Sequence, residues 1–239
     1  MLFFFIRHGD PTYDPDKLTP LGHRQAEAIG RRLARYGLDE IYASSAVRAR
    51  ETAIPACELL KKEAVILDWA HENHAWDEMT LPDANGNPTW NFVAPGMKEF
   101  YMSREIRDLG MRWYDHPFFD EGNTIRQGYL RIYKEAKDFF AAQGFVYDDE
   151  KGMYKNTVNN EKRVALFAHH GFGTAFLSSV LEIPYPLVCE KMNFGHTGMT
   201  VIRFDTRDEY VVPQMLTMAN DGHLLADNMP TGYNNKIFF

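Results

Sequence analysis

The stretch MLFFFIRHG, residues 1–9, decides the fold class of this chain. It begins with a short, uninterrupted apolar run, which is typical of a strand buried on both faces. Such strands belong to sheets covered by helices, and these sheets bind ligands beyond the carboxyl ends of their strands. We therefore predict an α/β protein in which Arg7 and His8 lie at the carboxyl edge of the sheet.

The pair Arg7-His8 has a chemistry that suits phosphoryl transfer. A neutral imidazole can attack phosphorus, and a neighbouring guanidinium can hold phosphoryl oxygens with two parallel hydrogen bonds. A second strongly apolar stretch, residues 164–168, ends at His169-His170-Gly171. Two strand ends that each deliver histidine and glycine predict a catalytic pair at one sheet edge.

Composition excludes several other classes of function. The chain has 239 residues and a formal charge of -7, which argues against a nucleic-acid partner and against an anionic membrane surface. No stretch approaches the ~20 apolar residues of a membrane span. Cys57 and Cys189 are the only cysteines, and their positions suggest no disulfide framework. We expect a cytoplasmic protein that needs no cofactor and no metal.

Strands and helices alternate over the first part of the chain. Thr19-Pro20 is typical of a helix start, Gly37 of a helix end, and residues 40–43 of a short strand. Ser44-Ser45 is predicted to cap a second helix that carries Arg48 in its first turn. Pro55 should kink this helix, and a strand follows at residues 64–67.

The alternation stops at residue 68 and resumes near residue 124. The segment between is rich in Trp, Phe, Tyr, Asn and Pro, and we expect an irregular insertion, or cap, over the sheet edge. A helix over 124–142 comes next, and a second insertion, a hairpin, is predicted at about 145–160. Closing strands are expected near 200–204 and 210–216. We expect one domain over residues 1–239, a three-layer sandwich whose central sheet is mostly parallel, with helices on both faces.

Four motifs together resemble the histidine phosphatase superfamily, the phosphoglycerate mutase-like proteins. They are RHG at residues 7–9, LTPLGHRQA at 18–26, SSAVRARETA at 44–53 and AHHG at 168–171. They occur in the family's order and lie outside the segments 68–123 and 145–160. The sequence departs from the family's motifs at two places. Ala168 and His170 replace a common Ser and Gly, and Asn123-Thr124 lacks the acidic residue that many relatives have there.

The resemblance implies roles for particular residues. His8 would be the nucleophile that becomes phosphorylated, while Arg7, Arg48 and His169 would surround the phosphoryl group. Fixed donors suit a transition state that spreads negative charge over equatorial oxygens. Glu72, just after the third strand, is the expected proton donor, with Asp77 and Glu78 as second choices and Asp10 as a weaker one.

The aromatic residues of the insertion have two interpretations. Most of them should pack around a long loop, and a minority, including Trp69 and Trp76, should line the substrate mouth. Aromatic faces with few nearby cations would suit a leaving group that is not highly charged.

Three alternative functions remain open. The cluster His71-Glu72-Asn73-His74 could suggest metal hydrolysis, although it lacks the histidine spacing of the zinc-protease helix. A mutase would pass the phosphoryl group to a second hydroxyl rather than to water. A non-catalytic phosphate-binding protein could use the same fold. We favour a metal-independent phosphatase acting on a small phosphorylated metabolite.

Overall fold

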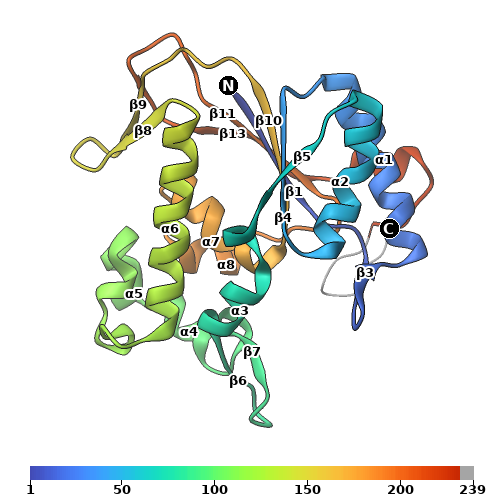
Figure 1. Cartoon of the computed structure of the whole chain (residues 1–239). Coiled ribbons are helices and arrows are strands. Elements are labelled where there is room, and N and C mark those ends of the chain that lie inside the picture. The colour runs from blue at the N-terminus through green and yellow to red at the C-terminus, as the bar shows by residue number, and fades with distance from the viewer. Residues whose placement is uncertain (232–239) are drawn as a thin grey trace.

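The computed structural model describes residues 1–231. Its centre is a six-stranded sheet in the order β13-β11-β1-β10-β4-β5 (Figure 1). The strands in this order are β13 (Gln214–Asn220), β11 (Met199–Arg203), β1 (Leu2–Arg7), β10 (Arg163–Ala168), β4 (Glu40–Ser44) and β5 (Ala64–Leu67). Only β11 runs against the other five strands. The predicted fold class is confirmed.

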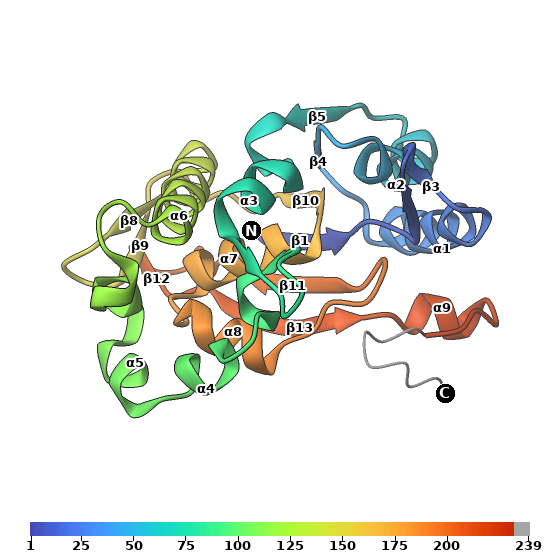
Figure 2. The same cartoon turned by 90° about the horizontal axis from the view of Figure 1, so that it is seen from below.

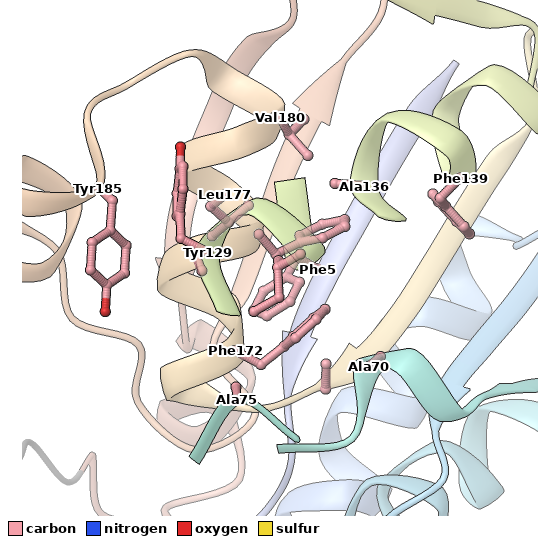
Figure 3. Close-up of a cluster of buried hydrophobic side chains, with 14 of the residues drawn as sticks. Phe5, Ala70, Ala75, Tyr129, Ala136, Phe139, Phe172, Leu177, Val180 and Tyr185 are labelled. Atoms are coloured by element: carbon pink, nitrogen blue, oxygen red, sulfur yellow. The ribbon is translucent and has the colours of Figure 1, made fainter. Parts of the chain in front are cut away.

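The apolar run of β1 is explained by the helices on both faces of the sheet. Successive strand side chains point to opposite faces, so Phe3 and Phe5 belong to one core cluster and Phe4 and Ile6 to the other. The second cluster packs under α1 (Pro20–Tyr36) and α2 (Val47–Leu60). The first packs under α6 (Thr124–Ala142) and α7 (His170–Leu181), where Phe5 lies close to Phe172 (Figure 3).

The ends of α1 follow the predicted signals, whereas the start of α2 does not. The Thr19 side chain accepts a hydrogen bond from the Gly22 amide, and Gly37 ends α1 with a φ of 71°. Ser44 and Ser45 do not cap α2, because its N-cap is Ala46 and makes no side-chain cap bond. The carboxylate of Asp16 takes that place, 2.8 Å from the Val47 amide. The helix continues beyond Pro55 to Leu60.

The segment 68–123 contains more regular structure than the sequence predicted. Its elements are η1 (Asp68–Ala70), α3 (Glu72–Met79), β6 (Thr80–Pro82), β7 (Pro88–Trp90), η2 (Asn91–Val93), α4 (Met97–Tyr101), α5 (Arg104–Leu109), η3 (Gly110–Asp115) and η4 (Pro117–Phe119). Tyr101, Trp113 and Phe119 are fully buried within it. Figure 1 shows α3 and the β6–β7 pair below the carboxyl ends of the parallel strands.

The predicted strand at 210–216 is divided between two sheets. β12 (Tyr210–Val211) pairs with the hairpin of β8 (Phe145–Asp148) and β9 (Met153–Asn156), while β13 joins the central sheet. The remaining elements are β2 (Pro11–Tyr13), β3 (Asp16–Leu18), α8 (Tyr185–Lys191) and α9 (Gly222–Ala226). β2 and β3 pair as an antiparallel hairpin. Within residues 1–231, no helix is long and apolar enough to cross a membrane.

We expect Gly22→Ala to destabilise the protein. A Cβ at Gly22 would lie 2.1 Å from the Asp10 carbonyl oxygen, so the backbone of the 9–10 loop would have to move. Overpacking of this kind costs about 1–3 kcal/mol, which is a fall of about 2–12 °C in Tm for a chain of this size. Thermal unfolding measures it. Gly122→Ala is the control, because its nearest neighbour would lie at an ordinary 3.6 Å; an equal fall in both variants would contradict the prediction.

Candidate active site

His8 follows β1 directly, and its ring is held in one orientation. Its Nδ1 lies 2.7 Å from the Gly9 carbonyl oxygen, which can only accept a hydrogen bond. Nδ1 must therefore carry the proton, and the neutral ring keeps its lone pair on Nε2. The Nε2 atom is buried and has no hydrogen-bond partner. This is the state that a nucleophilic imidazole requires.

The loop that carries His8 is tied to α2 through Thr52. The Thr52 hydroxyl accepts a hydrogen bond from the Gly9 amide at 2.9 Å and donates one to the Arg48 carbonyl at 2.6 Å. This arrangement fixes the backbone behind His8 relative to the first turn of α2. Residues 7–9 and 44–53, which are separate in the sequence, thereby share one site.

Two buried arginines supply positive charge. Arg7 is 8% exposed and donates from Nη1 to the Phe194 carbonyl, while Arg48 is 4% exposed and pairs with Asp16 at 2.9 Å and with Glu72 at 3.3 Å. The Nε atoms of both guanidiniums are buried without a partner. Since buried polar groups are nearly always hydrogen-bonded, both donors remain available to an anion.

His169 follows the strand next to β1 and lies opposite His8. The two ring centroids are 5.2 Å apart. The Nε2 atom of His169 is 2.7 Å from the Ser44 hydroxyl, and its Nδ1 is 3.5 Å from Glu72 Oε2. Nδ1 makes no hydrogen bond in the protein. The predicted pairing of the two strand-end histidines is therefore present in the structure.

Glu72 is the acidic candidate that lies among these groups. Its Oε1 accepts hydrogen bonds from the Gly171 and Phe172 amides at 2.8 and 3.4 Å, which leaves Oε2 facing His169 and Arg48. It is the first residue of α3, and Figure 2 shows this helix between the α6–α7 side and the α2–β3 side.

The other acidic candidates have different surroundings. Glu78 is bound by Arg131, with Nε 3.0 Å from Oε2, and Asp77 is exposed. Asp10 accepts from the Thr19 hydroxyl and lies 3.6 Å from His196, whose ring is 5.6 Å from that of His8. Glu72 thus has the position that a proton donor needs.

Burial dominates the electrostatics of the two histidines. It lowers the pKa of His8 well below the usual range, and His169 and Arg7 add to the effect. The pKa of His169 is also lowered well below its usual range by burial, with Arg48 as the next cause. Both rings are therefore neutral at pH 7.

These pKa shifts predict that stability falls in mild acid. The unfolded chain protonates each histidine near pH 6.5, whereas the folded chain keeps both neutral, so the stabilisation is complete above pH 6.5 and is lost as pH falls toward the lower folded pKa. For each of the two histidines, the free energy of unfolding should fall by about 1 kcal/mol between pH 6.5 and 5.5. Urea unfolding at these pH values tests this. His8→Asn should show a shallower dependence than the wild type, and an unchanged dependence would contradict the assignment.

A cavity of about 420 Å³ opens beside Arg48 and Glu72, and its other lining residues are Tyr13, Asn73, Trp76 and Trp90. Trp76 therefore lines a cavity next to Arg48 and Glu72. Trp69 does not, since its ring packs on Phe139, Phe172 and Phe176 in the core.

Several residues of the site were missed by sequence reasoning. Asp16 was unassigned and Ser44 was interpreted only as a helix cap, yet they contact Arg48 and His169. Trp90 was one of many aromatic residues. These contacts join segments that are distant in the sequence, so no local pattern marks them.

Possible metal ligands also differ from the sequence cluster. His71 Nδ1 accepts a hydrogen bond from the Asn73 amide and His74 Nε2 lies 3.2 Å from Asp68. Within residues 1–231, the set whose ligand atoms lie within 4.8 Å of one another is instead His8, Glu72 and His169. The buried guanidiniums of Arg7 and Arg48 nearby disfavour a bound cation.

The chain resembles known proteins in sequence and in fold. Residues 3–112 match the family model of the histidine phosphatase superfamily (branch 1). No curated protein matches the chain closely enough to count as a relative.

Solved structures with the same fold include phosphatases. A mutant phosphoserine phosphatase from Entamoeba histolytica, in complex with phosphoserine, is 17% identical, with 93% of this chain and 98% of that chain covered and a TM-score of 0.57. A mycobacterial glucosyl-3-phosphoglycerate phosphatase is 17% identical, with 91% and 98% covered and a TM-score of 0.58.

The matched residues 3–112 include Arg7, His8, Arg48 and Glu72, while β10 brings His169 to the same site from the second half of the chain. Together with the shared fold, this confirms the family predicted from the motifs. Residues 3–112 match the histidine phosphatase superfamily, as the motifs predicted, and the chain as a whole has the fold of the phosphatases named above.

Proposed function

We propose that this chain is a metal-independent phosphatase that hydrolyses small phosphomonoesters through a phosphohistidine at His8. One observation carries the proposal. Within this site, four buried polar atoms lack partners, namely Nε of Arg7, Nε of Arg48, Nε2 of His8 and Nδ1 of His169. A phosphoryl group at this place would accept from the two guanidiniums and from His169, and would meet the lone pair of His8.

In the first step, His8 Nε2 attacks phosphorus, so that a P–N bond forms as the ester P–O bond breaks. Arg7, Arg48 and His169 hold the equatorial oxygens, whose charge grows in the transition state. Glu72 donates a proton to the leaving oxygen, which departs as an alcohol.

In the second step, water attacks the phosphohistidine. Glu72, now a carboxylate, takes a proton from this water as the new P–O bond forms and the P–N bond breaks. Inorganic phosphate leaves and His8 returns to its neutral form. Water is therefore the final acceptor, in contrast to a mutase.

The related structures favour hydrolysis over mutase chemistry. Those described above are phosphatases, and the cavity of about 420 Å³ suits a small substrate. We further propose one domain over residues 1–239, with 68–123 as a cap and 145–160 as an insertion. A cytoplasmic location is consistent with Cys57 and Cys189, which are both free.

The test is phosphate release from a panel of phosphorylated metabolites, measured with and without a chelator. We expect release that the chelator does not change. Isomerised product without phosphate would identify a mutase. Vanadate binding without turnover would identify a binding protein, and loss of activity in chelator would show metal catalysis.

A further inference from the structure

The cavity beside Glu72 has an aromatic wall that the catalytic steps do not use. Tyr13 from β2, Trp76 from α3 and Trp90 from β7 line it. The rings of Trp76 and Trp90 lie 5.2 Å apart at 89°. Three aromatic side chains from three separate elements therefore face one small space next to the reacting groups.

Trp90 is held in place by its neighbours. Its ring is stacked on Phe92 at 5.8 Å, and a Cβ at Gly171 would lie 2.2 Å from the indole. The same Gly171 donates its amide hydrogen to Glu72. The aromatic wall is thus packed against Gly171, the residue whose amide holds Glu72 in position.

Charge in this cavity disfavours an anionic leaving group. Among the described residues that line it, the only cation is Arg48. Its two terminal nitrogens are already engaged, Nη1 by Asp16 and Nη2 by Glu72. A carboxylate on the leaving group would find no unpaired terminal nitrogen on this arginine, which is the only cation among the described lining residues.

Other cations are found in a different place. Lys98 and Lys191 line a separate cavity together with His170 and Glu190. Phe92, which is stacked on Trp90, also lines that second cavity. The lysines therefore belong to a different hollow from the one lined by Trp76.

We infer that the leaving group of the substrate carries no anionic group and presents a flat apolar or aromatic face to Trp76 and Trp90. The inference rests on the proposed phosphatase function and adds the substrate class. It differs from the ligand of the phosphoserine phosphatase structure, because phosphoserine carries a carboxylate. Trp76 selects the face, and Asp16 leaves a second anion without a partner because it holds Nη1 of Arg48.

The test compares three phosphomonoesters that all release an alkoxide: benzyl phosphate, 4-carboxybenzyl phosphate and methyl phosphate. We expect kcat/KM for benzyl phosphate to exceed both others at least about 10-fold. Equal values, or a preference for the carboxylate, would overturn the inference. If none of the three releases phosphate and a wider panel also fails, the proposed function itself is wrong.

Variants separate the contribution of Trp76 from that of Asp16. Trp76→Ala should lower kcat/KM for benzyl phosphate about 10-fold, mainly through KM, and methyl phosphate much less, while Trp76→Phe should retain most of the preference. Asp16→Asn should raise the relative rate for 4-carboxybenzyl phosphate. Trp69→Phe is the control, because Trp69 packs in the core. An unchanged ratio in Trp76→Ala would overturn the role of Trp76, and an unchanged ratio in Asp16→Asn that of Asp16.

Discussion

His8→Ala should lower kcat by at least about 10⁴-fold, because removal of a nucleophile that forms a covalent intermediate abolishes both half-reactions. The wild type, quenched during turnover of a ³²P-labelled substrate, should carry label that is stable in base and lost in acid, as expected for phosphohistidine. The variant should carry none. Steady-state kinetics and quenched labelling measure the two effects.

Two controls keep this result interpretable. His8→Ala should still unfold cooperatively and bind vanadate, because Arg7, Arg48 and His169 remain. His196→Ala removes a second histidine ring near His8, at 5.6 Å, and should keep the label. Label that persists in His8→Ala, or that disappears only in His196→Ala, would assign the nucleophile elsewhere.

Glu72→Gln should lower kcat by about 10²–10⁴-fold for substrates with poor leaving groups, because the lost proton donor matters most where the departing oxygen is most basic. The fall in kcat should therefore be far larger for methyl phosphate than for 4-nitrophenyl phosphate. The amide oxygen of glutamine can still accept from the Gly171 amide, so the backbone contact survives the change. The measurement is kcat for both substrates in both proteins.

Glu78→Gln is the matched control on the same helix. Glu78 pairs with Arg131, and its loss should affect stability more than the leaving-group dependence. Equal losses for good and poor leaving groups in Glu72→Gln would assign Glu72 to positioning of Arg48 instead. The same outcome in Glu78→Gln as in Glu72→Gln would show a general disturbance of α3.

The core of the site could be predicted because its signals are local. Arg7-His8 and His169 follow buried apolar strands, and parallel neighbours in a sheet bring their carboxyl ends to one edge. Arg48 lies in the first turn of α2, whose start follows β4. Hydrophobic periodicity and the ends of buried strands are set by neighbouring residues, so they can be predicted along the chain.

The residues that contact Arg48 and His169 could not be predicted, because these contacts depend on where distant segments of the chain meet. Nothing next to Asp16 indicates that its carboxylate will cap α2 and bind Arg48, and nothing next to Ser44 indicates that it will contact His169 instead of capping a helix. The division of 210–216 between two sheets likewise depends on the hairpin β8–β9 as a partner for β12.

The sequence by itself determined the α/β class and predicted Arg7, His8, Arg48, Glu72 and His169 as one group of residues, which the structure brings together. Only the tertiary structure decided which of the two predicted tryptophans lines the cavity. Trp69 and Trp76 lie in the same aromatic segment, but Trp69 packs under α6 and α7 while Trp76 lines the cavity. The physical reason is that an aromatic side chain lowers its free energy by burial in either place, so only the path of the chain selects one.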